Sequence, residues 1–232
     1  MALSLLQTDA VGVLLKPGMC VASMGYPDII APMKMIEDIM GDKAAGLAYR
    51  NDSEAICKRH GLPNRPIPDA ESFFSLMGAE LTVYDVIQER GCEVLLDLNQ
   101  PMLTMEYYDI VLDVGTVEHC FNIAQAIINM AILVKVGGVI IHENPFNCGN
   151  HGFYSLNPTF YSDFYLANGF SVKDCRLFSR EGRIGAVPQG KRFSFTEEEA
   201  NIFFMAERLT VKTFVYPVQA KYANMIPTKE AA

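Results

Sequence analysis

Four histidines are the side chains best suited to move a proton near neutral pH, because imidazole titrates in that range. His151 lies in a loop after a predicted strand, between Asn147 and Tyr154, and His119 follows an earlier strand beside Glu118. A histidine at such a position can take the proton of a hydroxyl group that attacks an electrophile. We therefore predict His151 as a general base and His119 as the second candidate. Asn147 and Tyr154 would hydrogen-bond a hydroxylated substrate, and Tyr154 is also a catalytic candidate.

These residues also have purely structural interpretations. His60 lies in the polar stretch KRHG, which predicts a solvated side chain. His142, near the end of an apolar strand, is typical of a buried histidine with satisfied hydrogen bonds. His119 can cap the start of a helix, and Asn147 and Tyr154 can satisfy backbone groups of a rigid loop. The sequence leaves both interpretations open.

The spacing of ligand residues does not favour metal binding. His119 and His151 together with Glu118 or Glu143 would supply nitrogen and oxygen ligands, but no short ligand motif joins them. The 6 cysteines contain no CxxC pair and are expected to be ordinary thiols in a reducing cytoplasm. We predict no metal site.

Alternating strand and helix patterns position these residues and predict an α/β fold with parallel strands. Apolar residues at helical spacing predict helices at 70–77 and 123–134. Asp69 is expected to cap the first helix and Gly78 to end it, whereas Gly137 and Gly138 are expected to end the second. Strands are expected at residues 19–22, 81–84, 93–96, 108–114, 139–141, 170–178 and 201–209.

Acidic residues follow successive strands, at the sheet edge where α/β proteins bind their ligands. Asp85 and Asp97 each end a predicted strand, whereas the chain has neither a GxGxxG sequence nor a Walker glycine loop to hold phosphates. Carboxylates at these positions suit a ribose diol and an adenine amino group, on a ligand that carries a positive sulfonium. These features predict S-adenosylmethionine as the cofactor.

Several blocks, in order along the chain, resemble class I S-adenosylmethionine-dependent methyltransferases: LTVYDV, CEVLLDLNQP, YYDIVLDVGTVEHCFN and LVKVGGVIIHENP. More narrowly, DLNQP, GTVEHCFN and PFNCGNHGFYSLNP are similar to the DxNxP, GTxEHxFN and HGFYxxxP blocks of a group of small bacterial methyltransferase-like proteins. The similarity spans residues 69–170, with a weaker match at SMGYPD. The resemblance implies a Rossmann-like α/β fold. Its sheet would be mostly parallel and seven-stranded, with the last strand antiparallel and helices on both faces.

The resemblance also implies roles for single residues that bind the cofactor. Gly25, in the turn after the first strand, would pass close to the methionine part of the cofactor, where a Cβ atom would collide. Asp85 would accept hydrogen bonds from the ribose hydroxyls. Asp97 and Leu98 would lie beside adenine.

Gly115 and Thr116 would, by the same resemblance, line the cofactor near its sulfur. The chain departs from the family at the first motif, which has one glycine, Gly25, where two or three are usual. The distance along the chain from Gly25 to Asp85 is also longer than usual, and residues 28–68 account for it. This segment has the pattern of a helical insertion after the first strand. It can be a lid, an oligomer contact, or an extra helical pair that only packs, within one domain spanning residues 1–232.

Charge and hydropathy limit the partners of the chain. Lysine and arginine number 19 against 27 acidic residues, and the net charge of −8 disfavours nucleic acid and anionic membrane surfaces. No apolar stretch is long enough to span a membrane, and the N-terminus lacks the features of a signal peptide. We expect a cytoplasmic protein with a small-molecule acceptor, and nothing in the sequence indicates an oligomer.

The predicted reaction is methyl transfer, an in-line displacement in which the enzyme mainly aligns acceptor and methyl group. We predict O-methylation of a small hydroxylated molecule, such as a sugar or nucleotide-sugar, with a histidine as base. The alternative is a degenerate member that binds the cofactor, or nothing, and works as a scaffold subunit. The single glycine of the first motif favours that alternative, whereas the missing glycine fingerprint disfavours a nicotinamide-dependent oxidoreductase.

Overall fold

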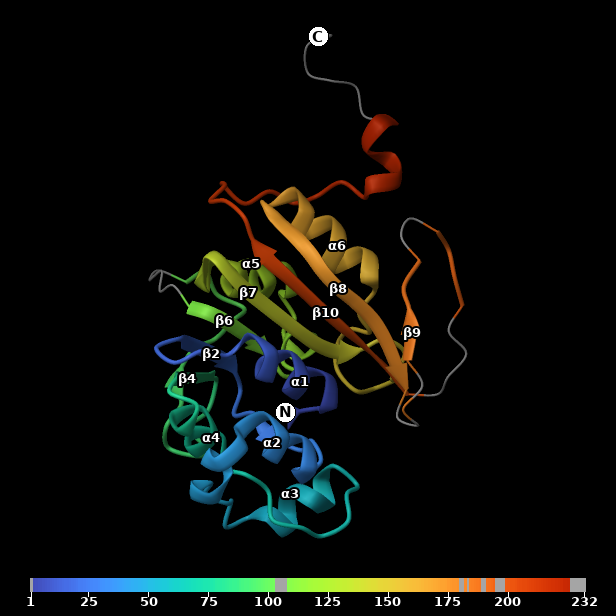
Figure 1. The fold of residues 1–232 in the computed structure, drawn as a ribbon. Coiled ribbons are helices and arrows are strands. Elements are labelled where there is room, and N and C mark those ends of the chain that lie inside the picture. Colours follow the sequence, from blue (N-terminus) through green and yellow to red (C-terminus); the bar gives the residue numbers. More distant parts are fainter. Residues whose placement is uncertain are drawn as a thin grey trace.

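The computed structural model describes residues 2–102, 108–179, 182, 184–188, 191–194 and 199–225. Within them, an eight-stranded sheet runs through the middle of the molecule (Figure 1). The strands lie in the order β5-β4-β2-β6-β7-β10-β8-β9. Their bounds are β2 (Cys20–Met24), β4 (Glu80–Asp85), β5 (Val94–Leu95), β6 (Tyr108–Asp113), β7 (Val134–Pro145), β8 (Phe170–Ser179), β9 (Ile184–Ala186) and β10 (Ala200–Arg208).

The strand directions are those of a Rossmann-like α/β sheet. All pairs from β5 to β7 are parallel, β10 is antiparallel to both β7 and β8, and β9 is antiparallel to β8. The chain moves outward from β2 to β5 on one side and from β6 to β7 on the other. Strand order therefore reverses between β2 and β6, and ligands of such sheets bind at the carboxyl ends beside the reversal.

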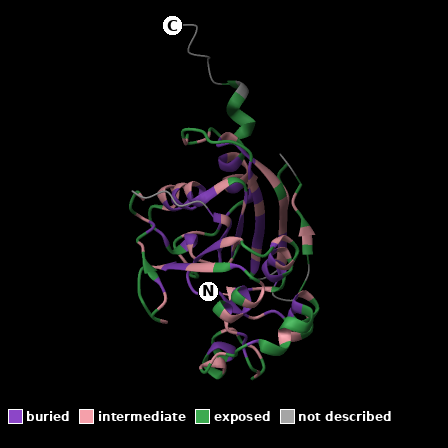
Figure 2. Ribbon diagram, turned by 60° about the vertical axis from the view of Figure 1, so that its left-hand side comes forward, coloured by how far each residue is buried: buried purple, intermediate pink, exposed green. Residues whose placement is uncertain are grey.

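Successive residues of a strand point to opposite sides of the sheet, so each strand packs against helices on both faces. Val21 and Ile110 pack on one face against α1, α2 and α4, whereas their neighbours Ala22 and Val111 pack on the other against α5 and α6. The strands in the middle are accordingly the most buried part of the molecule (Figure 2). The helix bounds are α1 (Leu5–Leu14), α2 (Met33–Met40), α3 (Ser53–Arg59), α4 (Ala70–Leu76), α5 (Ile123–Leu133) and α6 (Pro158–Ala167).

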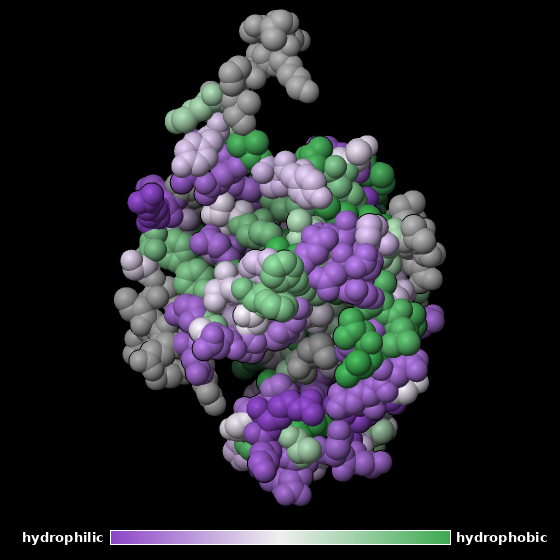
Figure 3. Space-filling view, turned by 180° about the vertical axis from the view of Figure 1, so that it is seen from behind, coloured by the Kyte–Doolittle hydropathy of each residue, from purple (hydrophilic) through white to green (hydrophobic). Residues whose placement is uncertain are grey.

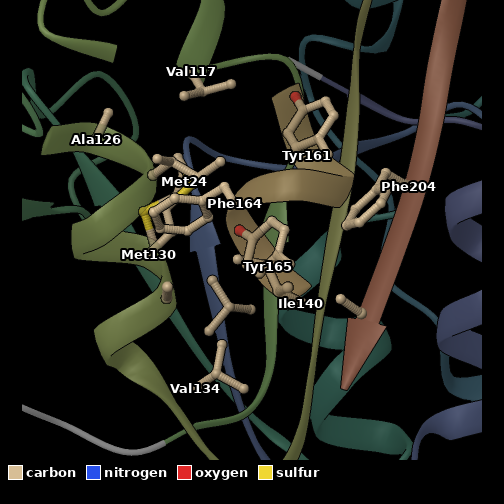
Figure 4. Packing of buried hydrophobic residues seen from close by; sticks show 14 of the residues in the cluster. Met24, Val117, Ala126, Met130, Val134, Ile140, Tyr161, Phe164, Tyr165 and Phe204 are labelled. Carbon is tan, nitrogen blue, oxygen red and sulfur yellow. The ribbon is translucent and has the colours of Figure 1, made fainter. Parts of the chain in front are cut away.

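Aromatic side chains fill the core between α6 and the sheet (Figure 4). The rings of Tyr161 and Tyr165 stack on Phe204 of β10, with centroids 5.1 and 5.4 Å away. Both tyrosine hydroxyls lie in this buried layer, where each needs a hydrogen-bond partner. Those partners are residues of the candidate site.

The segment that follows β2 packs partly on the sheet, through α2, and partly forms a small structure of its own. It contains β3 (Asp28–Ile29), α2, the 3₁₀ helix η1 (Gly41–Gly46) and α3, and β3 pairs in parallel with the N-terminal strand β1 (Ala2–Leu3). A core of its own surrounds Ile56, Cys57 and Ile67. The bottom of the molecule, where α3 lies, has a largely hydrophilic surface (Figure 3). Two further 3₁₀ helices are η2 (Val117–His119) and η3 (Ala220–Met225), and η3 projects from the body near the C-terminus (Figure 1).

Most predicted boundaries agree with the structure. The Asp69 carboxylate accepts the backbone N–H of Ser72 at 2.9 Å and caps α4, and Gly78 follows the helix with φ +83°. The predicted strand bounds differ from the observed ones by a few residues, and β9 is an edge strand that the sequence pattern did not indicate. The described sheet therefore has eight strands rather than seven.

The predicted role of Gly137 and Gly138 is wrong. Helix α5 already ends at Leu133, and both glycines lie within β7. The register of β7 on β6 shifts there, Gly137 has φ +80°, and a Cβ on Gly138 would lie 2.9 Å from the carbonyl oxygen of Tyr108. The glycines thus allow a bulge against the neighbouring strand, which a single sequence does not reveal. No helix among the described residues is long and apolar enough to cross a membrane.

Candidate active site

A cavity of about 770 Å³ opens at the carboxyl ends of the parallel strands, beside the reversal in strand order. Residues after β4, β5, β6 and β7 line it, together with residues of the N-terminus and of the segment after β2. Its volume is within the range of small-molecule sites. The predicted residues on its wall are Asp85, Asp97, Leu98, Gly115, Thr116, His119 and His151.

Asp113, the last residue of β6, organises the floor of this region. Its fully buried carboxylate accepts the backbone N–H groups of Thr116 and Val117 through Oδ1, at 2.9 and 3.3 Å. Its Oδ2 lies 2.7 Å from Nδ1 of His142 and accepts the Nδ2 of Asn144 at 2.9 Å. One carboxylate thus fixes both the turn after β6 and the end of β7.

His142 is a buried histidine with both ring nitrogens hydrogen-bonded, as predicted. Besides its contact with Asp113, its Nε2 lies 2.6 Å from the hydroxyl of Tyr165. Its side chain is fully buried. It therefore supports the floor and has no access to a substrate.

Glu118 in η2 is a fully buried carboxylate directed at the cavity. Its Oε2 accepts the Nδ2 of Asn144 at 2.9 Å, so Asn144 bridges Glu118 and Asp113. Tyr161 donates a short hydrogen bond to Oδ1 of Asn144, which fixes the amide from the other side. The Oε1 of Glu118 lies 3.5 Å from Nε2 of His151 and 3.9 Å from Nε2 of His119.

The loop that carries His151 is attached to η2 by its own backbone. Phe153 donates its N–H to the carbonyl of Glu118 at 2.9 Å. A Cβ on Gly152 would lie 2.8 Å from that carbonyl oxygen, so glycine permits the close approach. This contact brings His151 beside His119, with ring centroids 5.4 Å apart.

The two histidines predicted as bases therefore both lie beside the Glu118 carboxylate. Their side chains are about half exposed, at 51% for His119 and 52% for His151, so both are open to a substrate. The neighbouring Glu118 carboxylate raises the pKa of His151, because it stabilises the imidazolium form. A buried carboxylate behind an exposed imidazole is an arrangement suited to general base catalysis.

The predicted ribose and adenine residues also line the cavity. Oδ1 of Asp85 accepts the N–H groups of Val86 and Ile87 at 2.7 and 3.4 Å, and among the described residues no donor binds its Oδ2. Asp97 is exposed, and its Oδ1 accepts both the backbone and side-chain N–H groups of Asn99, which lower its pKa. Asp97 thus holds its own turn, and the residue still lines the cavity.

Gly115 and Thr116 lie in the turn between β6 and η2 and line the cavity. Gly115 has φ +86°, and a Cβ there would lie 3.4 Å from Oε1 of Glu118. The hydroxyl of Thr116 donates to the carbonyl of Met24. Gly25 has φ +87° and donates its N–H to the carbonyl of Tyr84, but it is buried and is not among the residues that line the cavity.

Asn147 and Tyr154 are the predicted substrate ligands that the structure places elsewhere. Oδ1 of Asn147 accepts the N–H of Ala200, and the Tyr154 hydroxyl donates to the carbonyl of Phe121 at 2.8 Å. Neither side chain lines the cavity. These contacts correspond to the rigid-loop interpretation.

The wall also contains polar residues that were not predicted as site residues. Arg59 and His60, at the end of α3, bring the segment after β2 to the cavity. The prediction of a solvated His60 is wrong, because its side chain is only 18% exposed and burial lowers its pKa to about 4. Ser4 donates a short hydrogen bond to Glu143, and both line the cavity. These contacts between distant segments depend on tertiary packing, so no local pattern in the sequence predicts them.

Glu143 is expected to make stability fall as pH rises. Burial raises its pKa from 4.5 to about 8, so between these values the folded state keeps a proton that the unfolded state has released. The free energy of unfolding then decreases from pH 4.5 to 8. Glu143→Gln removes this loss and should be more stable than the parent at pH 8 by about 1–3 kcal/mol.

Urea unfolding at pH 5.5 and pH 8 measures this difference. Glu89→Gln, at an exposed position, is the matched control and should follow the parent at both pH values. Parallel pH dependence of the parent and Glu143→Gln would contradict the assignment.

Comparisons with known proteins give similarities of the overall fold only. No family model matches the chain, and no curated protein matches it. One similar solved structure is a 1,6-didemethyltoxoflavin-N1-methyltransferase from Burkholderia thailandensis, with 13% identity, 88% of this chain and 78% of that chain covered, and a TM-score of 0.47. A putative methyltransferase from Bacillus halodurans has 12% identity, covers 89% and 99%, and has a TM-score of 0.46.

A third similar structure is a putative rRNA-methylase from Clostridium thermocellum. It has 13% identity, coverage of 89% of this chain and 96% of that chain, and a TM-score of 0.47. At these values the overlaps carry no assignment of activity.

Proposed function

We propose that this chain is an S-adenosylmethionine-dependent methyltransferase that methylates a hydroxyl group of a small acceptor. One observation carries the proposal. A single cavity beside the strand-order reversal has acids after β4 and β5 on one part of its wall and the cluster of Glu118, His119 and His151 on another. The first part suits a nucleoside and the second suits the removal of a hydroxyl proton.

The cofactor would bind along β4, β5 and the turn after β6. Asp85 would accept hydrogen bonds from the ribose diol through Oδ2, since its Oδ1 is engaged by its own turn. The buried side chain of Leu98 would provide an apolar contact for adenine, beside Asp97. Gly115 would leave room for the methionine part and its sulfonium, in front of Glu118.

His151 would act as the base of the transfer. The acceptor oxygen attacks the methyl carbon in line with the carbon–sulfur bond, whose electrons return to sulfur, and Nε2 of His151 takes the hydroxyl proton. The Glu118 carboxylate would stabilise the imidazolium that forms, from 3.5 Å. His119, 3.9 Å from the same oxygen, would be a neighbour rather than the base.

Residues 28–68 would form one side of the acceptor entrance. Arg59 and His60 carry this segment to the cavity wall, and the net charge of −8 favours a small acceptor over a nucleic acid. We propose that this segment acts as a lid over the cavity.

The cofactor site is tested first by calorimetric titration of the full chain with S-adenosylmethionine and S-adenosylhomocysteine. Asp85→Ala is expected to weaken binding by about 1.5–3 kcal/mol, or roughly 10- to 150-fold, because a ribose diol loses a charged hydrogen-bond partner. Asp42→Ala, at an exposed position in η1, is the control and should bind as the parent does.

Two outcomes would overturn the proposed cofactor. Binding of NADH alone would point to a different nucleotide. No adenosyl binding to a folded protein would favour a scaffold subunit, the alternative that the position of Gly25 outside the cavity wall supports.

A further inference from the structure

Three side chains hold potential ligand atoms close together at the acceptor end of the cavity, where the proposed base His151 lies. A carboxylate oxygen of Glu118 and one imidazole nitrogen from each of His119 and His151 all lie within 4.8 Å of one another. Two histidines and one carboxylate are a ligand set that divalent transition metals accept, with the remaining positions left for water or substrate.

The buried oxygen of Glu118 is a second, independent indication of a ligand. Its side chain is fully buried and faces the cavity, Oε2 is hydrogen-bonded by Asn144, and Oε1 has no hydrogen-bond partner among the described residues. Nor does a lysine or arginine among the described residues form an ion pair with this carboxylate. The two imidazoles approach Oε1 only to 3.5 and 3.9 Å. A buried carboxylate oxygen without a hydrogen bond is costly, and a cation bound between Oε1 and the two rings would remove that cost.

We propose that Glu118, His119 and His151 bind a divalent transition-metal ion of the zinc type. Tetrahedral zinc with ligand bonds of 2.0–2.1 Å separates its ligand atoms by about 3.3 Å. The observed 3.5 and 3.9 Å from Oε1 to the two Nε2 atoms are within reach of that value by small rotations of half-exposed rings. Glu118 itself is held by Asn144, as outer hydrogen bonds usually hold metal-binding carboxylates.

The open metal position would face the cavity. Metal binding itself does not depend on methyl transfer, whereas its role rests on the proposed function. In that case the acceptor hydroxyl would be the fourth ligand, and the ion would orient it and lower its pKa, so that its proton would pass to water. Nε2 of His151 cannot bind the ion and take the proton at the same time, so the two roles exclude each other at this atom.

The test is calorimetric titration of the metal-free full chain with zinc chloride. We expect one ion per chain, bound with a Kd below about 10 μM. His119→Ala, His151→Ala and Glu118→Gln should each weaken binding by on the order of 100-fold or more, because each removes one of three ligands. His60→Ala is the matched control, since it removes a histidine from the same cavity wall but not from the cluster, and it should bind as the parent does.

Cobalt titration and cofactor titration decide the remaining outcomes. Cobalt absorption with bands of nitrogen and oxygen ligation is expected, and thiolate charge-transfer bands would overturn the site by placing the metal on cysteines. Zinc affinity unchanged in the three cluster variants, or a parent Kd above about 100 μM, would also overturn it. Binding of S-adenosylhomocysteine without zinc binding would reject only the metal site, and zinc binding without it would reject only the proposed function.

Discussion

Asp113→Ala is expected to lower the free energy of unfolding by about 3–5 kcal/mol. The change removes the acceptor of four groups, namely the backbone N–H groups of Thr116 and Val117, Nδ1 of His142 and Nδ2 of Asn144. The carboxylate and both side-chain partners are buried, so water cannot replace the lost bonds. Urea unfolding followed by circular dichroism measures the loss.

Asp109→Ala is the matched control for this prediction, because it removes a carboxylate at the other end of the same strand. Asp109 accepts one backbone N–H, from Cys20, and pairs with Lys135, whose side chain is 45% exposed. We expect a loss of about 1 kcal/mol for this variant. Equal losses for the two variants would contradict a special role of Asp113 in holding the site together.

Much of the site's membership follows from the sequence. Parallel strands place their carboxyl ends at one edge of a sheet, so residues directly after strands are expected to meet there. Asp85, Asp97 and Gly115 come to one cavity in this way. His119 and His151 are 32 positions apart, and both follow neighbouring strands, β6 and β7.

The orientation of side chains within the site does not follow from the sequence. Asn147 and Tyr154 lie in the expected loop, but they turn to backbone carbonyl and amide groups rather than to the cavity. Glu118 gains its position from burial against Asn144 and from the close approach of Gly152. These contacts join segments that are 26 or more residues apart, and no local periodicity records them.

The largest functional effect is expected for His151→Ala, measured in protein treated with a chelator. Turnover should fall by about 10²- to 10⁴-fold with an acceptor found by screening small hydroxylated compounds for S-adenosylhomocysteine release. Binding of the cofactor should be unchanged, since His151 belongs to the acceptor end of the cavity. Turnover falls because the variant lacks the base whose imidazolium form Glu118 stabilises.

The His119→Ala variant distinguishes a mechanism with His151 as the base from a mechanism that uses the metal site. Without metal, its turnover should fall by less than about 10-fold, because a base at His151 remains on Glu118. If a bound zinc ion instead lowers the pKa of the acceptor hydroxyl, so that its proton passes to water, the two variants should lose turnover equally, and the chelator alone should abolish it in the parent. Equal losses together with full activity in chelator would contradict both mechanisms, because neither a single base nor a metal would then explain why both histidines are required.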